Sequence, residues 1–121
     1  MNNRIYKFRA WDNMYQKIIM FPSLAELFEN YEGEYKRYNL MQFTGLLDKN
    51  GNEIYEGDIL APMPNDYKDT YKGNWKVVYD GGAYFGKDAD GHHITWLPYW
   101  TEQQFKIIGN IYENPELLEG K

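Results

Sequence analysis

The chain has 121 residues and a formal net charge of −5, because 18 Asp and Glu residues outnumber 13 Lys and Arg residues. This length predicts one domain over residues 1–121, and the acidic balance argues against a nonspecific nucleic-acid binder, which must neutralise phosphates. The lack of cysteine excludes a disulfide framework, a thiol nucleophile and a Cys-ligated metal. No apolar run approaches the ~18–20 residues of a membrane span. No signal-peptide core is expected either, so we expect a cytoplasmic protein with no membrane partner.

The N-terminal third predicts a β-hairpin followed by one helix. Residues 4–11 and 14–21 are expected to be strands, joined by a two-residue turn at Asp12-Asn13, because both turn residues tolerate left-handed backbone angles. Ser23 can cap a helix and Glu26 stands three residues later, which is the capping-box spacing. The apolar periodicity that follows predicts a short helix near residues 24–32.

The rest of the chain predicts short strands separated by turns. Asn50-Gly51 predicts a hairpin between strands at 38–44 and 53–61, and Gly57 within the second predicts a bulge or a close backbone approach. Strands at 75–80 and 83–87 are expected to form a hairpin about Gly81-Gly82, and further strands are expected at 92–97 and 105–112, with a long loop at 62–74.

These elements predict a mainly β fold of the β-rich α+β class. Turns at regular spacing with short aromatic strands favour a partly open, strongly bent, barrel-like sheet with the one short helix.

Aromatic residues are unusually frequent: the chain has 12 Tyr, 6 Phe and 4 Trp. Such side chains fill β cores, but they are also enriched in contact surfaces. The candidate binding residues are Trp11, Trp75, Tyr79, Tyr84, Trp96, Tyr99 and Trp100.

No catalytic constellation emerges from the motifs. Ser23 is the only serine, and its capping context accounts for it. Glu56 and Asp58 share a strand face and could form an acid–base pair, although two acidic residues with this spacing more often form a solvated strand face. For a metal site only weak candidates exist, namely Asp88, Asp90 and His92. We therefore expect no enzyme activity, no cofactor and no metal.

Charge is uneven along the chain. Residues 1–45 carry 6 basic and 5 acidic side chains, a balance of +1, whereas residues 46–121 carry 7 and 13, a balance of −6. Basic and aromatic residues alternate in the first part, a pattern that single-strand binders use. The overall acidity makes nucleic acid a less favoured partner than protein.

Several separated motifs resemble the YopX-like family of bacteriophage and prophage proteins. They are Arg9-Ala10-Trp11-Asp12, Met41-Gln42-Phe43-Thr44-Gly45-Leu46, Asp48-Lys49-Asn50-Gly51, Glu53-Ile54-Tyr55-Glu56-Gly57-Asp58-Ile59 and Ile108-Gly109-Asn110-Ile111-Tyr112-Glu113-Asn114-Pro115-Glu116-Leu117-Leu118. The resemblance implies a phage-derived, cytoplasmic, mostly β protein and allows a homo-oligomer. It implies no catalytic residues, because the family has no established activity.

The leading hypothesis is a non-enzymatic accessory protein that acts on a host protein as a homo-oligomer. One alternative is a small-molecule binder that stacks a nucleotide-like ligand on its aromatic side chains. The other is a single-stranded nucleic-acid binder that uses the basic and aromatic N-terminal half.

Overall fold

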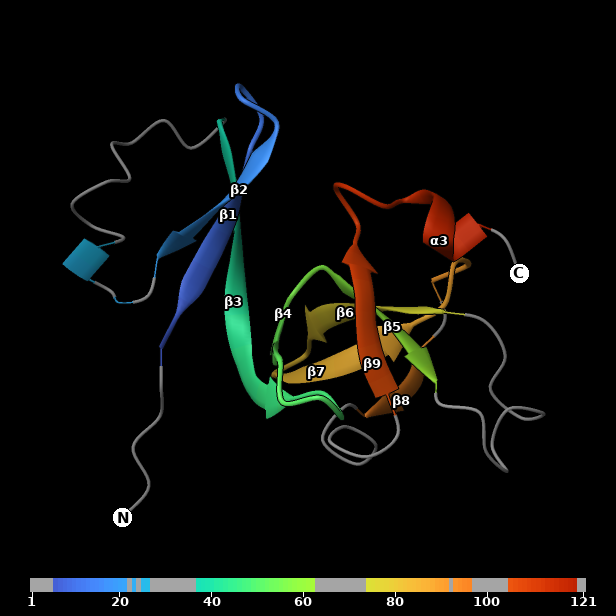
Figure 1. Ribbon diagram of the computed structural model, residues 1–121. Coiled ribbons are helices and arrows are strands. Elements are labelled where there is room, and N and C mark those ends of the chain that lie inside the picture. Colours follow the sequence, from blue (N-terminus) through green and yellow to red (C-terminus); the bar gives the residue numbers. More distant parts are fainter. Residues whose placement is uncertain are drawn as a thin grey trace, which may run out of the picture.

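The computed structural model describes residues 6–21, 23, 25–26, 37–62, 74–91, 93–96 and 105–119, with the backbone only at residues 62 and 93–96. These residues form two antiparallel sheets (Figure 1). The strands are β1 (Phe8–Asp12), β2 (Lys17–Phe21), β3 (Tyr38–Leu47), β4 (Glu53–Tyr55), β5 (Asp58–Pro62), β6 (Trp75–Asp80), β7 (Ala83–Lys87), β8 (His93–Trp96) and β9 (Phe105–Asn110).

The first sheet has the strand order β2-β1-β3-β4 and the second has the order β8-β7-β6-β5-β9. The long strand β3 bends between its pairing with β1 and its pairing with β4, and its register with β4 shifts between Phe43 and Leu47. The expected mainly β fold with a strongly bent, partly open sheet is confirmed.

One helix, α3 (Glu116–Glu119), lies within the described residues. Most of the helix predicted near residues 24–32 falls outside them. Its start is described: Ala25 and Glu26 are helical, and the Glu26 backbone N–H donates to the Ser23 hydroxyl at 3.2 Å. The predicted cap is therefore confirmed.

The predicted two-residue turn at Asp12-Asn13 is wrong. Asp12 is the last residue of β1 and pairs with Lys17, so residues 13–16 form a four-residue loop. The Asp12 carboxylate accepts hydrogen bonds from the backbone N–H groups of Met14 and Tyr15, which stabilises the longer loop. Gln16 closes the loop with a positive φ of 57°, which is unusual for a residue other than glycine.

The strand predicted over 53–61 is interrupted by a turn at Glu56-Gly57, which separates β4 from β5. Gly57 has a φ of +87°, and a Cβ at this position would lie 2.8 Å from the Met41 sulfur. The predicted close backbone approach at Gly57 is thus confirmed. The hairpin at Asn50-Gly51 and the hairpin between β6 and β7 are confirmed as well.

The larger hydrophobic core lies over the second sheet. It comprises Ile54, Leu60, Trp75, Val77 and Phe105. A second, smaller cluster in the first sheet centres on Ala10 and Phe21. Burial of these side chains is the main stabilising term, at about 25 cal/mol per Å² of apolar surface removed from water.

A buried ion pair joins the two sheets. Arg9 of β1 donates from Nη2 to Asp58 Oδ1 of β5 at 2.8 Å, and both side chains are almost completely buried. The Arg9 guanidinium also lies over the Tyr55 ring, 4.9 Å from its centroid. Asp58 Oδ2 accepts the Tyr55 backbone N–H at 2.7 Å. The Asp58 carboxylate therefore binds both Arg9 of the first sheet and the backbone of the turn between β4 and β5.

We predict that Asp58→Ala lowers the free energy of unfolding by about 3–5 kcal/mol, because it leaves the Arg9 charge buried without its partner. Asp58→Asn should cost less, since an amide oxygen can still accept from Tyr55. Urea unfolding at pH 7 measures both. The control is Lys87→Ala, which removes a more exposed pair with Asp80 and should change the stability by about 1 kcal/mol or less. A cost at Asp58 as small as the control would contradict this role.

Candidate binding surface

The strands β2 and β1, the first half of β3 (residues 38–42) and the loop 13–16 together form a projecting three-stranded arm (Figure 1). Most of the large hydrophobic side chains that are exposed in the described part of the chain lie on or next to this arm. They are Tyr6, Met14, Tyr15, Met20 and Leu40, and the remaining two are Leu47 and Tyr79. Exposed apolar side chains gathered on one element indicate an interaction surface.

The tip of the arm is held in one conformation by polar contacts. Arg37 donates from Nε and Nη2 to the two carboxylate oxygens of Asp12, at 3.0 and 2.9 Å. Asn13 bonds with the Arg37 carbonyl through both its backbone and its side-chain nitrogen. The loop therefore presents Met14 and Tyr15 to solvent from a fixed backbone, with 61% and 64% of each residue exposed.

Tyr15 at the tip carries two cations close to its ring. The Arg37 guanidinium carbon lies 5.0 Å from the ring centroid and the Lys17 ammonium lies 5.8 Å from it. Cation–π contacts of this kind are worth about 0.5–1 kcal/mol at exposed sites. The tip is thus an apolar projection with Lys17 and the Asp12-paired Arg37 beside its ring.

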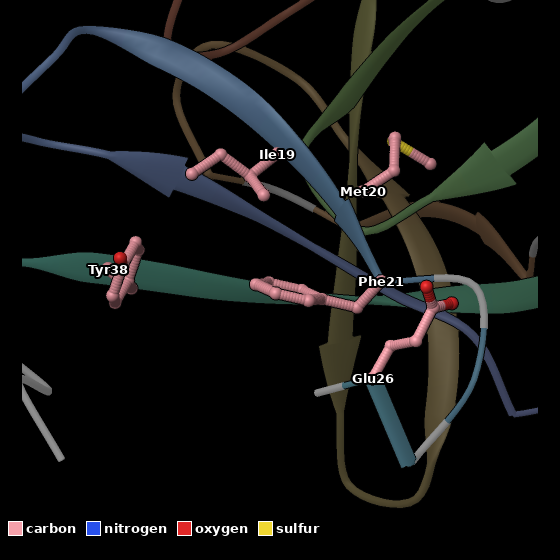
Figure 2. Close-up of a pocket in the computed structure, with 5 residues that line it drawn as sticks. All are labelled: Ile19, Met20, Phe21, Glu26 and Tyr38. Carbon is pink, nitrogen blue, oxygen red and sulfur yellow. The ribbon is translucent and has the colours of Figure 1, made fainter. Parts of the chain in front are cut away.

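Beside the arm lies an open cavity of about 340 Å³ (Figure 2). It is lined by Ile19, Met20, Phe21, Glu26 and Tyr38. Figure 2 shows the Phe21 ring directed along the sheet toward Tyr38 and the Glu26 carboxylate near the end of β2. Among the described residues that line the cavity, four have largely apolar side chains and Glu26 adds a carboxylate.

The predicted aromatic binding residues separate into three groups. Trp75 and Trp11 are buried, so they belong to the interior: Trp75 packs in the main core and Trp11 stacks on Tyr112 with a centroid distance of 5.5 Å. Tyr79 is 56% exposed and meets the half-buried Tyr84 edge to face at 5.1 Å. For Trp96 only the backbone is described, and Tyr99 and Trp100 lie outside the described residues.

The two carboxylates that the sequence suggested as an acid–base pair, Glu56 and Asp58, form hydrogen bonds that stabilise the fold. Glu56 Oε1 accepts the Gln42 backbone N–H at 2.7 Å, and Asp58 binds Arg9 and Tyr55 as described above. Burial raises the pKa of Asp58, and the nearby Arg9 only partly opposes this rise. The expected shared strand face is interrupted, because Glu56 and Gly57 form a turn and Asp58 begins β5.

Asp88 and Asp90 lie in a turn, where Asp88 Oδ1 accepts the Asp90 backbone N–H at 3.0 Å. His92, the third weak metal candidate, is outside the described residues. Within the part that is described, no three His, Asp or Glu side chains cluster as metal ligands.

Sequence reasoning did not single out Met14, Tyr15, Met20 or Leu40 as surface residues. Met14 and Tyr15 adjoin a predicted turn, which was the available signal for exposure. For Met20 and Leu40 the strand pattern carried no such signal, because apolar residues in a strand normally face a core.

The fold and its surfaces define a small, mostly β protein with a curled sheet and an exposed apolar arm. The chain belongs to the YopX family, since the family model described as YopX protein matches residues 15–119. This confirms the resemblance inferred from the motifs. The chain is also similar to the crystal structure of protein EF1440 from Enterococcus faecalis, with 30% identity, 96% of this chain and 99% of that chain covered, and a TM-score of 0.63.

A comparison with curated proteins found no match. None of the helices in the described residues is long and apolar enough to span a membrane.

We predict that the Asp12–Arg37 pair makes stability depend on acid pH. The hydrogen bond from Arg37 is the largest cause that lowers the pKa of Asp12, from 3.8 to about 2; burial opposes it, and the Met14 and Tyr15 backbone N–H groups assist it. Because the pKa of Asp12 is lower in the folded than in the unfolded chain, its carboxylate stabilises the fold at pH values above about 4. That contribution is lost as the pH falls from about 4 to about 2. Asp12→Asn should therefore be less stable at pH 7 and should show a flatter pH dependence in that window.

Urea unfolding at several pH values measures this slope, and Arg37→Met should flatten it in the same way. Part of the slope should remain, because Asp48 also has a lowered pKa: burial raises it, but the backbone N–H groups of Ile107, Asn52 and Asn50 together outweigh the burial. An Asp12→Asn slope equal to that of the wild type would refute the assignment.

Proposed function

We propose that this YopX-family chain is a phage-derived accessory protein that binds a host protein without catalysing a reaction, and that it works as a homo-oligomer. The observation that supports this proposal most is the gathering of exposed apolar side chains on the arm. Full burial of one such side chain in an interface is worth about 1.5–3 kcal/mol. The strand register places Leu40 on the face of the arm that carries Ala10 and Ile19, and Met20 on the opposite face with Arg9 and Met41.

The rigidity of the arm supports the same function. A surface that is already ordered loses little conformational entropy when it binds, so more of the contact energy remains as affinity. The Asp12 contacts order the tip, and β1 is paired on both sides, by β2 and by β3, along all five of its residues.

The use of polar groups within the fold also supports a binding role. Asp12, Asp48 and Asp58 are buried acids, and each accepts backbone hydrogen bonds that shape a turn. Asn110 does the same for the turn after β9, accepting from Tyr112 and Glu113. These acceptors make hydrogen bonds within the fold. The exposed apolar side chains of the arm are therefore the feature that best supports binding to a partner.

Single-stranded nucleic acid is the second candidate partner, because Tyr15 is exposed beside Lys17 and Arg37. Bases stack on such rings while cations contact the phosphates, and the contact is weakened by salt. A nucleotide-like ligand is less favoured, because two of the side chains predicted to stack on it, Trp11 and Trp75, are buried.

We predict that the double variant Tyr6→Ser, Leu40→Ser loses host-protein capture while it keeps its fold. Both residues are more than 40% exposed, so the change should remove contact area and leave the melting temperature nearly unchanged. The immobilised protein is incubated with lysate of the bacterium that carries the gene, and captured proteins are quantified by mass spectrometry. At least a tenfold loss of one specific partner is expected, which corresponds to about 1.4 kcal/mol.

The matched control is Tyr79→Ser, which removes a more exposed tyrosine from the second sheet and should leave capture unchanged. Equal losses in both variants would argue against the arm as the contact surface. Binding of a labelled single-stranded oligonucleotide that is lost in Tyr15→Ser would favour the nucleic-acid candidate over a host protein.

A further inference from the structure

We infer that the outer edge of β2 accepts an extended segment of a partner protein as an additional antiparallel strand, with apolar side chains beside Ile18 and Met20 and an acidic residue opposite Lys17. This inference rests on the host binding of the proposed function and names the kind of segment that the arm recognises. It draws on the direction of the backbone groups of β2, on the regularity of this strand and on the charge at its first residue.

The hydrogen bonds of β1 determine which of its backbone groups are directed toward β2. The Phe43 N–H donates to the Lys7 carbonyl at 2.8 Å, and the Asn13 N–H donates to the Arg37 carbonyl at 2.7 Å. Both bonds follow the register between β1 and β3, so the odd-numbered residues of this segment bond with β3. Because backbone groups alternate in direction along a strand, the even-numbered residues of β1 bond with β2.

The backbone of β2 therefore has free groups at two positions. The even-numbered residues of β1 are matched with residues 17, 19 and 21 of β2. Ile18 and Met20, which alternate with these, direct their N–H and C=O groups away from β1 and toward the outer edge. The next even-numbered residue in the sequence, Pro22, has no backbone N–H. The donors that this edge offers to another strand are thus the N–H groups of Ile18 and Met20.

The strand β2 is regular enough to accept another strand. Within the described chain it has a neighbouring strand, β1, on one side only. Its pairing with β1 runs over five residues without a bulge, and none of these residues is proline. Edge strands normally avoid further pairing through bulges, prolines or inward charges. In strand addition the main-chain hydrogen bonds supply affinity, and alternate side chains supply specificity.

The side chains of β2 indicate the chemistry of the added segment. Ile18 and Met20 lie on one face of the sheet, and Met20 is 51% exposed, so apolar side chains opposite them remove apolar surface from water. Lys17 is the only charged residue of β2 and is exposed. Its ammonium lies 5.8 Å from the Tyr15 ring centroid, and it makes no ion pair with any described residue. An acidic residue of the partner opposite Lys17 complements this charge.

The first test measures amide exchange of the full chain by NMR, with the peptide acetyl-Thr-Val-Thr-Val-Glu-amide as the probe. In the free chain the amides of Ile18 and Met20 should exchange rapidly, whereas the amide of Ile19, which bonds with β1, should be protected. The peptide should slow exchange at Ile18 and Met20. Amides that are already protected at these two positions in the free chain would show that the edge is covered, and would overturn the inference.

The second test separates the backbone of Met20 from its side chain. Met20→Pro removes an outward N–H and no hydrogen bond to β1, which is the position where an edge strand tolerates proline. Affinity for the fluorescently labelled peptide, measured by anisotropy, should fall about tenfold. The matched control is Met20→Ala, which keeps the N–H and should lose less affinity than the proline variant. Equal affinities of Met20→Pro and the wild type would contradict strand addition.

The third test reverses the charge preference. Lys17→Glu should bind the acidic peptide about tenfold more weakly and should bind acetyl-Thr-Val-Thr-Val-Lys-amide better than the wild type does. Damage to the fold cannot produce a reversed preference, so this test decides the matter even if Met20→Pro does not fold. The control Lys106→Glu makes the same charge change on the second sheet and should leave both affinities unchanged. A preference that does not reverse in Lys17→Glu would refute the assignment.

Failure of this inference can be told apart from failure of the proposed function. If the acidic peptide does not bind while Tyr6→Ser, Leu40→Ser abolishes host capture, host binding stands and the β2 edge is not its site. If the peptide binds with the expected charge preference while no specific host protein is captured, the edge site stands and host binding fails.

Discussion

The buried ion pair between Arg9 and Asp58 is the contact on which the arrangement of the two sheets depends. It joins residues 49 positions apart in the sequence, one in β1 and one in β5. Removing two charges from water is expensive, and only close geometry with further hydrogen bonds offsets it. Arg9 has such additional contacts in the Glu56 carbonyl and the Tyr55 ring, although its Nε has no partner in the described structure. The pair thus restricts how the sheets can meet.

The turn between β4 and β5 connects this ion pair to the rest of the fold. Gly57 donates its N–H to the Val77 carbonyl and accepts from the Ile111 N–H, and a Cβ at this position would require the Met41 side chain to shift. One turn therefore contacts β3, β6 and the segment after β9. The arm extends from this junction, and its apolar side chains Met20 and Leu40 lie away from the main core. Their exposure supports the proposed binding role of the arm.

Local chemistry made several elements predictable. Asn50-Gly51, Gly81-Gly82 and the Ser23 cap each depend on residues within a few positions of one another, and all three are found where expected. The Asp12 turn was missed because its length depends on a carboxylate that binds two backbone N–H groups and also Arg37, 25 residues away. The same difficulty applies to the binding residues. A Trp in a strand looks the same whether its face is covered, as at Trp75, or open to solvent.

By itself the sequence determined the local features: the turn positions, the mainly β composition, the family and the lack of cysteine chemistry. Only the tertiary structure decided which side chains are covered. Alternation along a strand assigns a residue to one of two faces, but the burial of that face depends on elements that pack against it from distant parts of the chain. Arg9 illustrates the point, because a charged residue in an N-terminal strand becomes buried only when β5 brings Asp58 to it. Tyr15 is the opposite case. This aromatic residue is exposed to solvent because its loop, residues 13–16, extends beyond the end of the sheet.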